Sequence, residues 1–174
     1  MKFCVAKLQI SEFDQTLSNL VTVLRDSVNS GASLGYLAES PISDYKSFWQ
    51  KEFRDVEAGL TTILIARKQE HLVGVVCLSE VGKANQIHRA EVRKLLVTLD
   101  QQNQGIATAL MAEVECAARA AGKSLLTLDT ESNSAAEFLY QKLGWQKYGV
   151  IPRYAASPNG TLSECSFYFK ELPD

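Results

Sequence analysis

Several features that would assign a chain to a large protein class are scarce in this sequence. Its 174 residues contain only two histidines, and its four cysteines lie far apart, so no zinc-type ligand spacing can be assembled. We therefore expect no metal. The same cysteine pattern favours reduced, mostly buried thiols in a cytoplasmic protein. The stretch MKFCVAKLQISEFDQ is interrupted by Lys7 and Glu12, so we expect neither a signal peptide nor a membrane span there.

An excess of charge of one sign is also absent. The 18 basic and 20 acidic residues are interspersed, the formal net charge is −2, and no basic stripe is present. Nucleic acid and membrane surfaces are therefore not expected partners. The composition, 46% hydrophobic and 22% charged, is that of a globular protein. We expect a single domain over residues 1–174, without internal repeats or linkers.

What the sequence does contain is an alternation of strand and helix patterns. Period-2 or short apolar runs predict strands at 2–10, 61–66, 72–78, 90–97, 125–130, 145–151 and 164–170, with hairpin turns at RKQEH and SPNG. Helical spacing and caps predict helices that begin near Ser11 or Asp14, run over 44–57 and 105–121, and begin at Ser134 with a Glu137 capping box. Gly122 and Gly144 are expected to end the last two helices. This order predicts an α/β (α+β) fold, with a mixed sheet and helices on both faces.

The segment QQNQGIA, residues 101–107, is an uncharged turn between a strand and a helix. A glycine lets a ligand approach the main chain closely, and the following helix start presents unpaired N–H groups and a positive dipole end. Amides from Asn103 to Thr108 could therefore surround a pair of phosphates. The segment lacks the Gly-Lys-Ser/Thr end of a triphosphate loop and the three glycines of a dinucleotide fingerprint. Taken alone, the motif also fits an ordinary tight turn.

The order strand, Gln102-x-x-Gly105-x-Ala107, long helix, acid-tipped strand and FLYQKLGW resembles the GNAT superfamily of N-acetyltransferases. The resemblance is strongest over about 60–148, the expected cofactor-binding core. Segments that further resemble the tabtoxin resistance protein group are GASLGY, RAEVRKLLV, LLTLDTESNSAAEFLY and GVIPRYAASPNGTL. The resemblance implies a mostly antiparallel sheet of six to seven strands, splayed between two central strands. It also implies acetyl-CoA as acetyl donor.

In this family the turn binds the pyrophosphate, and the preceding strand pairs with the pantetheine arm. The cofactor-binding residues that follow from the resemblance are Leu95, Leu96, Val97, Gln102, Asn103, Gln104, Gly105, Ile106, Ala107, Thr108, Asn133 and Ser134. The three strand residues are equally compatible with core packing, and Ser134 with helix capping. Many relatives carry arginines in the turn, where this chain has amides. Phosphate binding must then depend on backbone dipoles and amide side chains, which is compatible with a lower affinity.

Glu91, Asp129 and Tyr140 are the candidate catalytic residues. Acetyl transfer must remove a proton from an ammonium group of pKa ~10.4 and supply one to the leaving thiolate. Asp129 ends an apolar strand, where it either serves function or lies at an exposed strand end; Glu91 alternates with Val92 and either faces the same cleft or forms a surface ion pair. Spacing alone places Tyr140 in the core, whereas the family pattern implies that it protonates the thiolate.

The sequence therefore predicts an N-acetyltransferase acting on a small, cationic or amino-acid-like amine. Tyr36 and Glu39, in the Gly- and Ser-rich stretch after the first helix, are expected near the acceptor. The alternatives are a non-catalytic acyl-CoA-binding sensor or interaction module, and an acetyltransferase of protein N-termini. A monomer and a homodimer are both compatible with the sequence.

Overall fold

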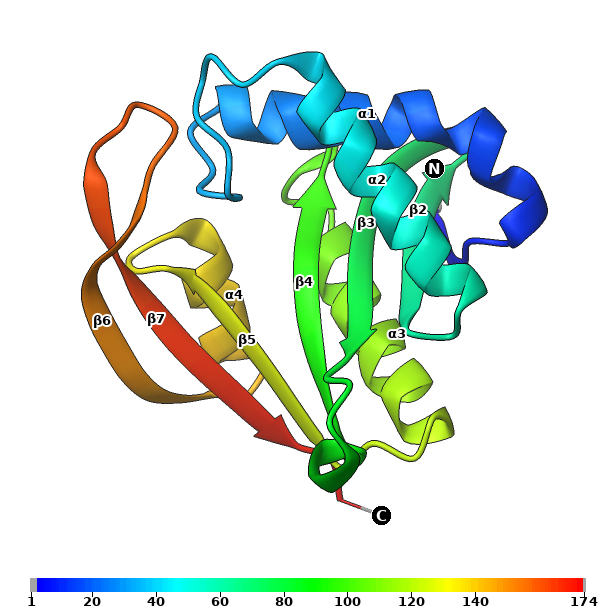
Figure 1. Cartoon of the computed structure of the whole chain (residues 1–174), viewed down its shortest axis with the longest axis vertical. Helices are drawn as coiled ribbons and strands as arrows, with labels where there is room; N and C mark the ends of the chain where they lie inside the picture. Colours follow the sequence, from blue (N-terminus) through cyan, green and yellow to red (C-terminus); the bar gives the residue numbers. More distant parts are fainter. Residues whose placement is uncertain (1–2, 174) are drawn as a thin grey trace.

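The computed structural model describes residues 3–173, which form a seven-stranded sheet and four α-helices (Figure 1). The strands, in the spatial order β1-β2-β3-β4-β5-β7-β6, are β1 (Cys4–Lys7), β2 (Thr61–Lys68), β3 (His71–Glu80), β4 (Arg89–Val97), β5 (Leu125–Glu131), β7 (Leu162–Glu171) and β6 (Gln146–Ala156). The helices are α1 (Phe13–Asn29), α2 (Ile42–Glu57), α3 (Ile106–Ala120) and α4 (Ala135–Lys142). Only β4 and β5 pair in parallel among these neighbours. The predicted mixed, mostly antiparallel fold is confirmed.

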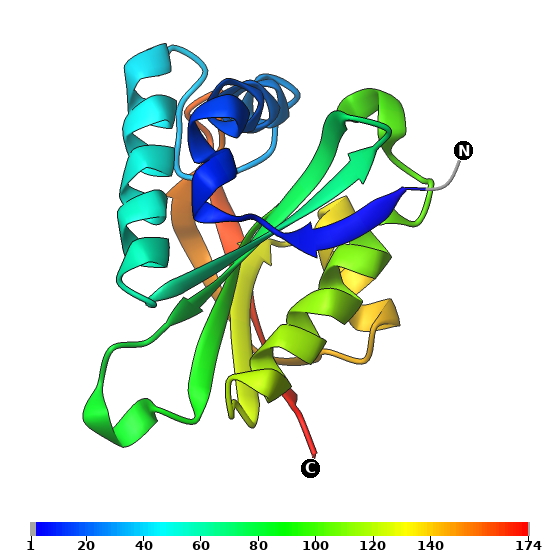
Figure 2. The ribbon, with the colours of Figure 1, turned by 90° about the vertical axis from the view of Figure 1, so that its right-hand side faces the viewer.

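Each face of the sheet is covered by its own pair of helices, as Figure 2 shows. Alternation along β3 sends Val75 and Cys77 into one apolar cluster with α1 and α2, and Val76 into a second cluster with α3. Gly74 permits the close approach of α3, because a Cβ there would lie 3.0 Å from Leu110 Cδ1 and 3.1 Å from Ile106 Cγ2. The start of α3 is thereby packed directly onto β3.

A β-bulge in β4 changes which face its residues cover. Cys77 pairs with Arg93 but Val75 pairs with Leu96, so β4 has one extra residue opposite Val76. Lys94, inside the bulge, has φ +54°, an unusual value for a residue with a side chain. Before the bulge Val92 packs toward α3, and after it Leu96 packs toward α1 and α2.

The sheet is split between its two central strands. Among the described residues, β4 and β5 pair at three positions, from Arg89 opposite Leu125 to Glu91 opposite Thr127. Further along, β5 continues to pair with β7, whereas β4 remains paired with β3. Figure 1 shows β4 and β5 moving apart beyond this point. The expected splay between two central strands is therefore present, and the edge of β4 that faces the split has no strand partner in residues 3–173.

Element limits differ from the sequence prediction where side chains bond to the local backbone. The first strand stops at Lys7, and a 3-10 turn, Ile10–Glu12, precedes α1 with a capping box between Gln9 and Glu12. Ser11 and Asp14 were therefore wrong as caps. Lys2, in the predicted strand, lies outside the described residues.

The two hairpins of the sheet are longer than the sequence predicts. The turn predicted over RKQEH narrows to residues 69–70, so β2 extends to Lys68 and β3 begins at His71. At the other side of the sheet, β6 and β7 extend to the predicted SPNG turn, which the N–H of Gly160 closes by donating to Ser157 O at 2.8 Å. Cys4 and Cys116 are exposed, so the expectation of mostly buried thiols holds only for Cys77 and Cys165.

A buried ion pair fixes α2 to the sheet beside the bulge. Glu52, 1% exposed, accepts from Arg93 Nη2 at 2.9 Å through both carboxylate oxygens. The same guanidinium donates to Ser79 Oγ at 2.7 Å. Charges removed from water need such complete pairing, so the arginine next to Lys94 is held in place by α2 and β3 together.

Glu137 connects α4 to β6 and β7. The predicted cap is present, because Ser134 Oγ accepts from the Glu137 N–H at 3.2 Å. The Glu137 carboxylate, 3% exposed, accepts from Asn133 N at 2.5 Å and from Tyr168 Oη at 2.7 Å, and pairs with Lys147 at 2.6 Å. Burial raises the pKa of this carboxyl group, but the hydrogen bonds from these donors outweigh it and lower the pKa from 4.5 to about 2.

Replacing Glu137 with Gln should destabilise the fold at neutral pH by about 2 kcal/mol, because the charge-assisted bonds are lost and Lys147 is left unpaired. A folded pKa below the unfolded one gives stability that is fully present above about pH 4.5 and is lost as the pH falls toward 2. Urea unfolding of wild type and E137Q across this range should show that the difference between their free energies of unfolding shrinks as the pH falls. E113Q, at an exposed helix position, is the matched control. An equal difference in free energy of unfolding at pH 7 and at pH 2.5 would contradict this account.

Candidate active site

The start of α3 is an uncapped helix N-terminus. Gly105, its N-cap residue, has φ +82°, and Asn103 has φ +60°, so the chain turns sharply before the helix. No side chain among the described residues caps the helix, and no described atom lies within 4 Å of where a Gly105 Cβ would stand. The N–H groups of the first turn therefore face open space with the positive end of the helix dipole, the arrangement that binds anions.

A cavity of about 450 Å³ lies over this helix end. It is lined by Leu95, Val97, Gln101, Gln102, Asn103, Gly105, Ile106, Ala107, Thr108, Ala135, Ala136, Leu139 and Lys142. The first two lie on β4, the next seven on the turn and α3, and the last four on α4. A diphosphate would fit the amides of the turn, and an extended chain would fit the unpaired edge of β4.

Two further cavities continue this one along the split. The second, about 480 Å³, shares Leu95, Val97 and Gln102 with the first and adds the loop after α1 and the segment 130–134 before α4. The third, about 330 Å³, shares Leu34, Leu95 and Ala136 with the second. Leu95 and Ala136 line all three, so a continuous cleft leads from the helix N-terminus to the far end of the split.

Tyr140 faces this far end from α4. Its side chain is 6% exposed, packs near Trp145 and Tyr168, and lines the third cavity. No group within residues 3–173 hydrogen-bonds its hydroxyl. Burial, and secondarily the charge of Asp129, raise the pKa of Tyr140 well above its usual range. The site therefore presents a protonated phenol with a free O–H to whatever occupies the cavity.

Asp129 lies opposite, at the end of β5. Its carboxylate is exposed to the cleft, which corresponds to the exposed strand end considered from the sequence. Cys165 Sγ on β7 donates to Asp129 Oδ2 at 3.4 Å; burial first, then Asp129, raise the pKa of this thiol to about 12. Asp129 and, more weakly, Glu91 also raise the pKa of Tyr154. A negative field therefore fills this end of the cleft.

Lys94, in the bulge of β4, binds the loop that follows α1. Its Nζ donates to Leu34 O at 2.6 Å and lies 5.1 Å from the Phe48 ring centre and 5.8 Å from that of Tyr36. Burial lowers the pKa of this ammonium.

The loop after α1 also reaches the opposite side of the cleft. The N–H of Ala38 donates to Pro158 O in the β6–β7 turn at 2.9 Å, so this loop connects the two halves of the split sheet.

Most residues predicted to bind a cofactor line the cleft, and Leu96, Asn133 and Ser134 do so in its middle part. Other predicted residues do not line it. The Gln104 side chain bonds to Lys68, and Glu91 on β4 is not among the residues that line the third cavity. Tyr36 packs on Tyr45 at 4.5 Å between ring centres, and Glu39 is exposed.

Sequence reasoning missed several residues that line the cleft. They are Gln101, Ala135, Ala136, Leu139, Lys142, Tyr154 and Cys165. For the four on α4, the available signal was their spacing, which places positions 135, 136, 139 and 142 on one side of a helix. For Tyr154 and Cys165 no local pattern marks a place in the cleft, because β6 and β7 bring them to Asp129 from further along the chain.

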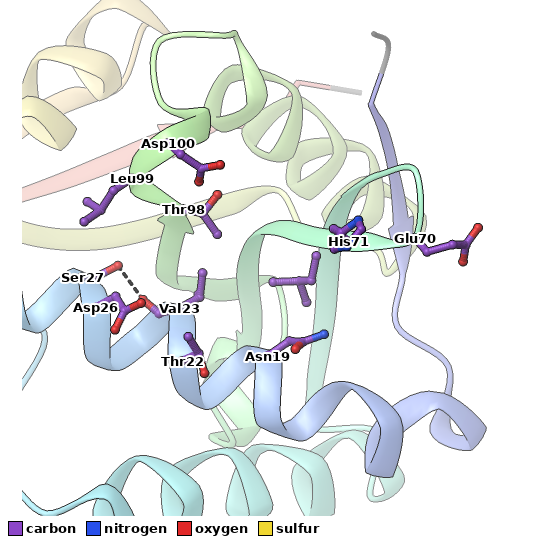
Figure 3. Close-up of a pocket in the computed structure, with 11 residues that line it drawn as sticks. Asn19, Thr22, Val23, Asp26, Ser27, Glu70, His71, Thr98, Leu99 and Asp100 are labelled. Carbon is purple, nitrogen blue, oxygen red and sulfur yellow. Dashed lines mark hydrogen bonds between the residues drawn. The ribbon is translucent and has the colours of Figure 1, made fainter.

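A separate cavity of about 370 Å³ lies between α1 and the ends of β3 and β4 (Figure 3). Its rim carries Asp26, Glu70 and Asp100, and none of the predicted site residues lines it. Within the part of the chain that the structure describes, no three His, Cys, Asp or Glu side chains are placed to hold a metal ion. Nor is any helix within residues 3–173 long and apolar enough to cross a membrane.

Solved structures share the whole architecture at low identity. An N-acetyltransferase from Staphylococcus aureus Mu50 superposes with a TM-score of 0.81 at 15% identity, covering 99% of this chain and 100% of that one. The protein yncA from Salmonella typhimurium, solved with its cofactor acetyl-CoA, gives 0.81 at 14% over 100% and 96%. A ribosomal-protein-alanine N-acetyltransferase from Brucella melitensis gives 0.77 at 19% over 97% and 99%.

These structural similarities show the fold, and the match to a family model shows the family. The model described as the acetyltransferase (GNAT) family matches residues 28–145, more than half of the chain, and its match includes the turn before α3, Asp129 and Tyr140. The protein therefore belongs to the GNAT family of acetyltransferases.

Proposed function

We propose that the protein transfers an acetyl group from acetyl-CoA directly to the primary amine of a small, cationic or amino-acid-like acceptor. The observation that carries this proposal is the single cleft that joins the uncapped start of α3 to the pocket between Tyr140 and Asp129. One end of the cleft suits a diphosphate, and the other end holds a proton donor, Tyr140, and a carboxylate, Asp129. A thioester arm laid along the split would connect them.

The residues fit acetyl-CoA, which supplies the activated acetyl group. Amides of Ile106, Ala107 and Thr108 would hold the diphosphate. The unpaired edge of β4 after Glu91 would pair with the amide-containing arm, as an added strand does.

Two proton transfers are then assigned to this chain's side chains. Asp129 would order a water that removes the amine proton, supported by the charge of Glu91 on the adjacent strand β4, and the neutral nitrogen attacks the thioester carbonyl. The attack forms the new carbon–nitrogen bond, the nitrogen then releases its second proton to solvent, and the carbon–sulfur bond breaks. Tyr140 donates its phenolic proton to the departing sulfur, and solvent restores it. The raised pKa of Tyr140 keeps its oxygen protonated until sulfur charge develops.

Charge in the acceptor pocket favours a cation. Asp129, Glu131 and Glu164 line it, whereas of the two cations that also line it Arg93 is paired with Glu52, so only the charge of Lys94 opposes these three acids. The net field therefore attracts an ammonium group. An amino-acid-like acceptor rests on the sequence resemblance to the tabtoxin resistance group.

The setting proposed for the reaction is the cytoplasm, where the four free cysteines would stay reduced, with the enzyme as monomer or homodimer. The rival is an acyl-CoA-binding sensor without turnover. An amine panel of amino acids, dipeptides, aminoglycosides and peptide N-termini, followed by thiol release, separates the two. Turnover with a small amine supports the proposal; tight acetyl-CoA binding with no thiol release from any amine supports the sensor.

Tyr140→Phe should lower kcat by roughly a hundredfold, because it removes the donor to sulfur while leaving the ring packing intact. The KM for acetyl-CoA should change little. Steady-state kinetics at saturating acetyl-CoA measure this, with Y148F, at an exposed tyrosine of β6, as the matched control. An unchanged kcat across neutral pH would exclude Tyr140 as the acid.

Asp129→Asn should lower kcat/KM for the amine by roughly a hundredfold at pH 7, since the ammonium then loses its proton acceptor. The defect should shrink as the pH approaches the acceptor's own pKa of ~10, where the neutral amine is abundant without help. The pH profile of kcat/KM tests this. A defect that stays constant to pH 10 would assign Asp129 a binding role instead.

A further inference from the structure

The turn before α3 has a charge deficit for its proposed ligand. Residues 101–105, QQNQG, carry no cation, and the charged residue beside them, Asp100, is negative. A diphosphate brings two negative charges, which the partial charge of one helix end balances only in part. A cation from elsewhere in the fold would complete the site.

Lys68 occupies the position required. It is the last residue of β2, and its Nζ donates to Gln101 Oε1 at 2.8 Å and to Gln104 Oε1 at 3.1 Å. These two glutamines lie 33 and 36 residues further along the chain and flank the turn. Gln101 also lines the cavity over the helix N-terminus, so the ammonium stands one side chain from that cavity.

The remaining contacts show that this arrangement is built rather than incidental. Gln101 Nε2 donates to Asp100 Oδ2 at 2.7 Å, so Asp100, Gln101 and Lys68 form one chain of hydrogen bonds. The hydrogen bond from Gln101 lowers the pKa of Asp100, and the charge of Lys68 adds to this effect. An ammonium has three N–H groups, and the two glutamines use two of them.

Asp100 supplies one negative charge beside Lys68, and the positive end of the helix dipole leaves room for a further anion. A cation near a helix N-terminus faces the positive dipole end, whereas stability alone favours an anion at that point. Lys142 on α4 lines the same cavity from its other side. Two lysines thus flank one uncapped helix end, with Asp100 as the acid bonded into this network.

We propose that Lys68 is a phosphate-binding residue that pairs with the coenzyme's diphosphate, with Gln101 and Gln104 holding its ammonium in place. This inference rests on the proposed use of acetyl-CoA. It assigns to β2 the charge that the turn lacks, so the glutamines act as positioning residues for a cation and not as neutral substitutes for one.

The test is calorimetric binding of coenzyme A and of dephospho-coenzyme A, which keeps the diphosphate but lacks the 3′-phosphate. Lys68→Met should weaken both ligands by roughly ten- to a hundredfold, the usual effect of removing a charge-assisted hydrogen bond. K68R, which keeps the charge, should stay nearer to wild type. K46M removes a lysine from an exposed site on α2 and should bind as wild type does.

The salt dependence of binding tests whether the effect of Lys68 is electrostatic. If it is, the ratio of wild-type to K68M affinity should fall as ionic strength rises from roughly 50 to 500 mM. Thermal melts of each variant show that the fold is kept. Equal binding by K68M and wild type would overturn the inference while leaving the proposed function intact. If K68M weakens binding of coenzyme A alone, Lys68 contacts the 3′-phosphate and not the diphosphate, which also overturns the inference. Wild type that fails to bind either ligand would remove the proposed function as well.

Discussion

The parting of β4 from β5 is the constraint on which the rest of this structure depends. Within the described residues the two strands share three residue pairs and then separate, so β4 keeps a free edge in the middle of a sheet. Exposed strand edges are normally protected, because their unpaired N–H and C=O groups recruit other chains. Here both sides of the opening are fixed. On the β4 side, α3 packs on Gly74 of the neighbouring strand β3. On the β5 side, the bonds of Glu137 join α4 to β6 and β7.

The two halves of the sheet contribute different parts of the chemistry. In the proposed reaction, β4 and the start of α3 provide main-chain groups, and the side chains of Gln101 and Gln104 hold Lys68 beside the turn. β5, α4 and β7 provide Asp129, Tyr140 and Cys165. The loop after α1 connects both, through Lys94 on one side and Pro158 on the other. This loop therefore lies against both halves of the cleft and lines its middle part.

Local sequence signals predicted the parts of the fold that are local. The turn at Gly105, the cap at Ser134 and the alternation of the central strands each follow from a few neighbouring residues, and each is present. The role of Tyr140 came from family resemblance, since spacing alone places it in the core, where it also packs. Lys68 could not be found in this way, because it was read as part of a polar hairpin turn. Its partners are Gln101 and Gln104, and only the folded sheet brings β2 beside the turn.

The free edge of β4 also bears on how long the molecule survives. A ligand that pairs along that edge can bind only the folded chain, so its concentration adds to the free energy of unfolding. Sub-global opening along the gap, where proteases would gain entry, is suppressed in proportion. Bound ligand would therefore protect the chain from proteolysis to an extent set by the ligand concentration.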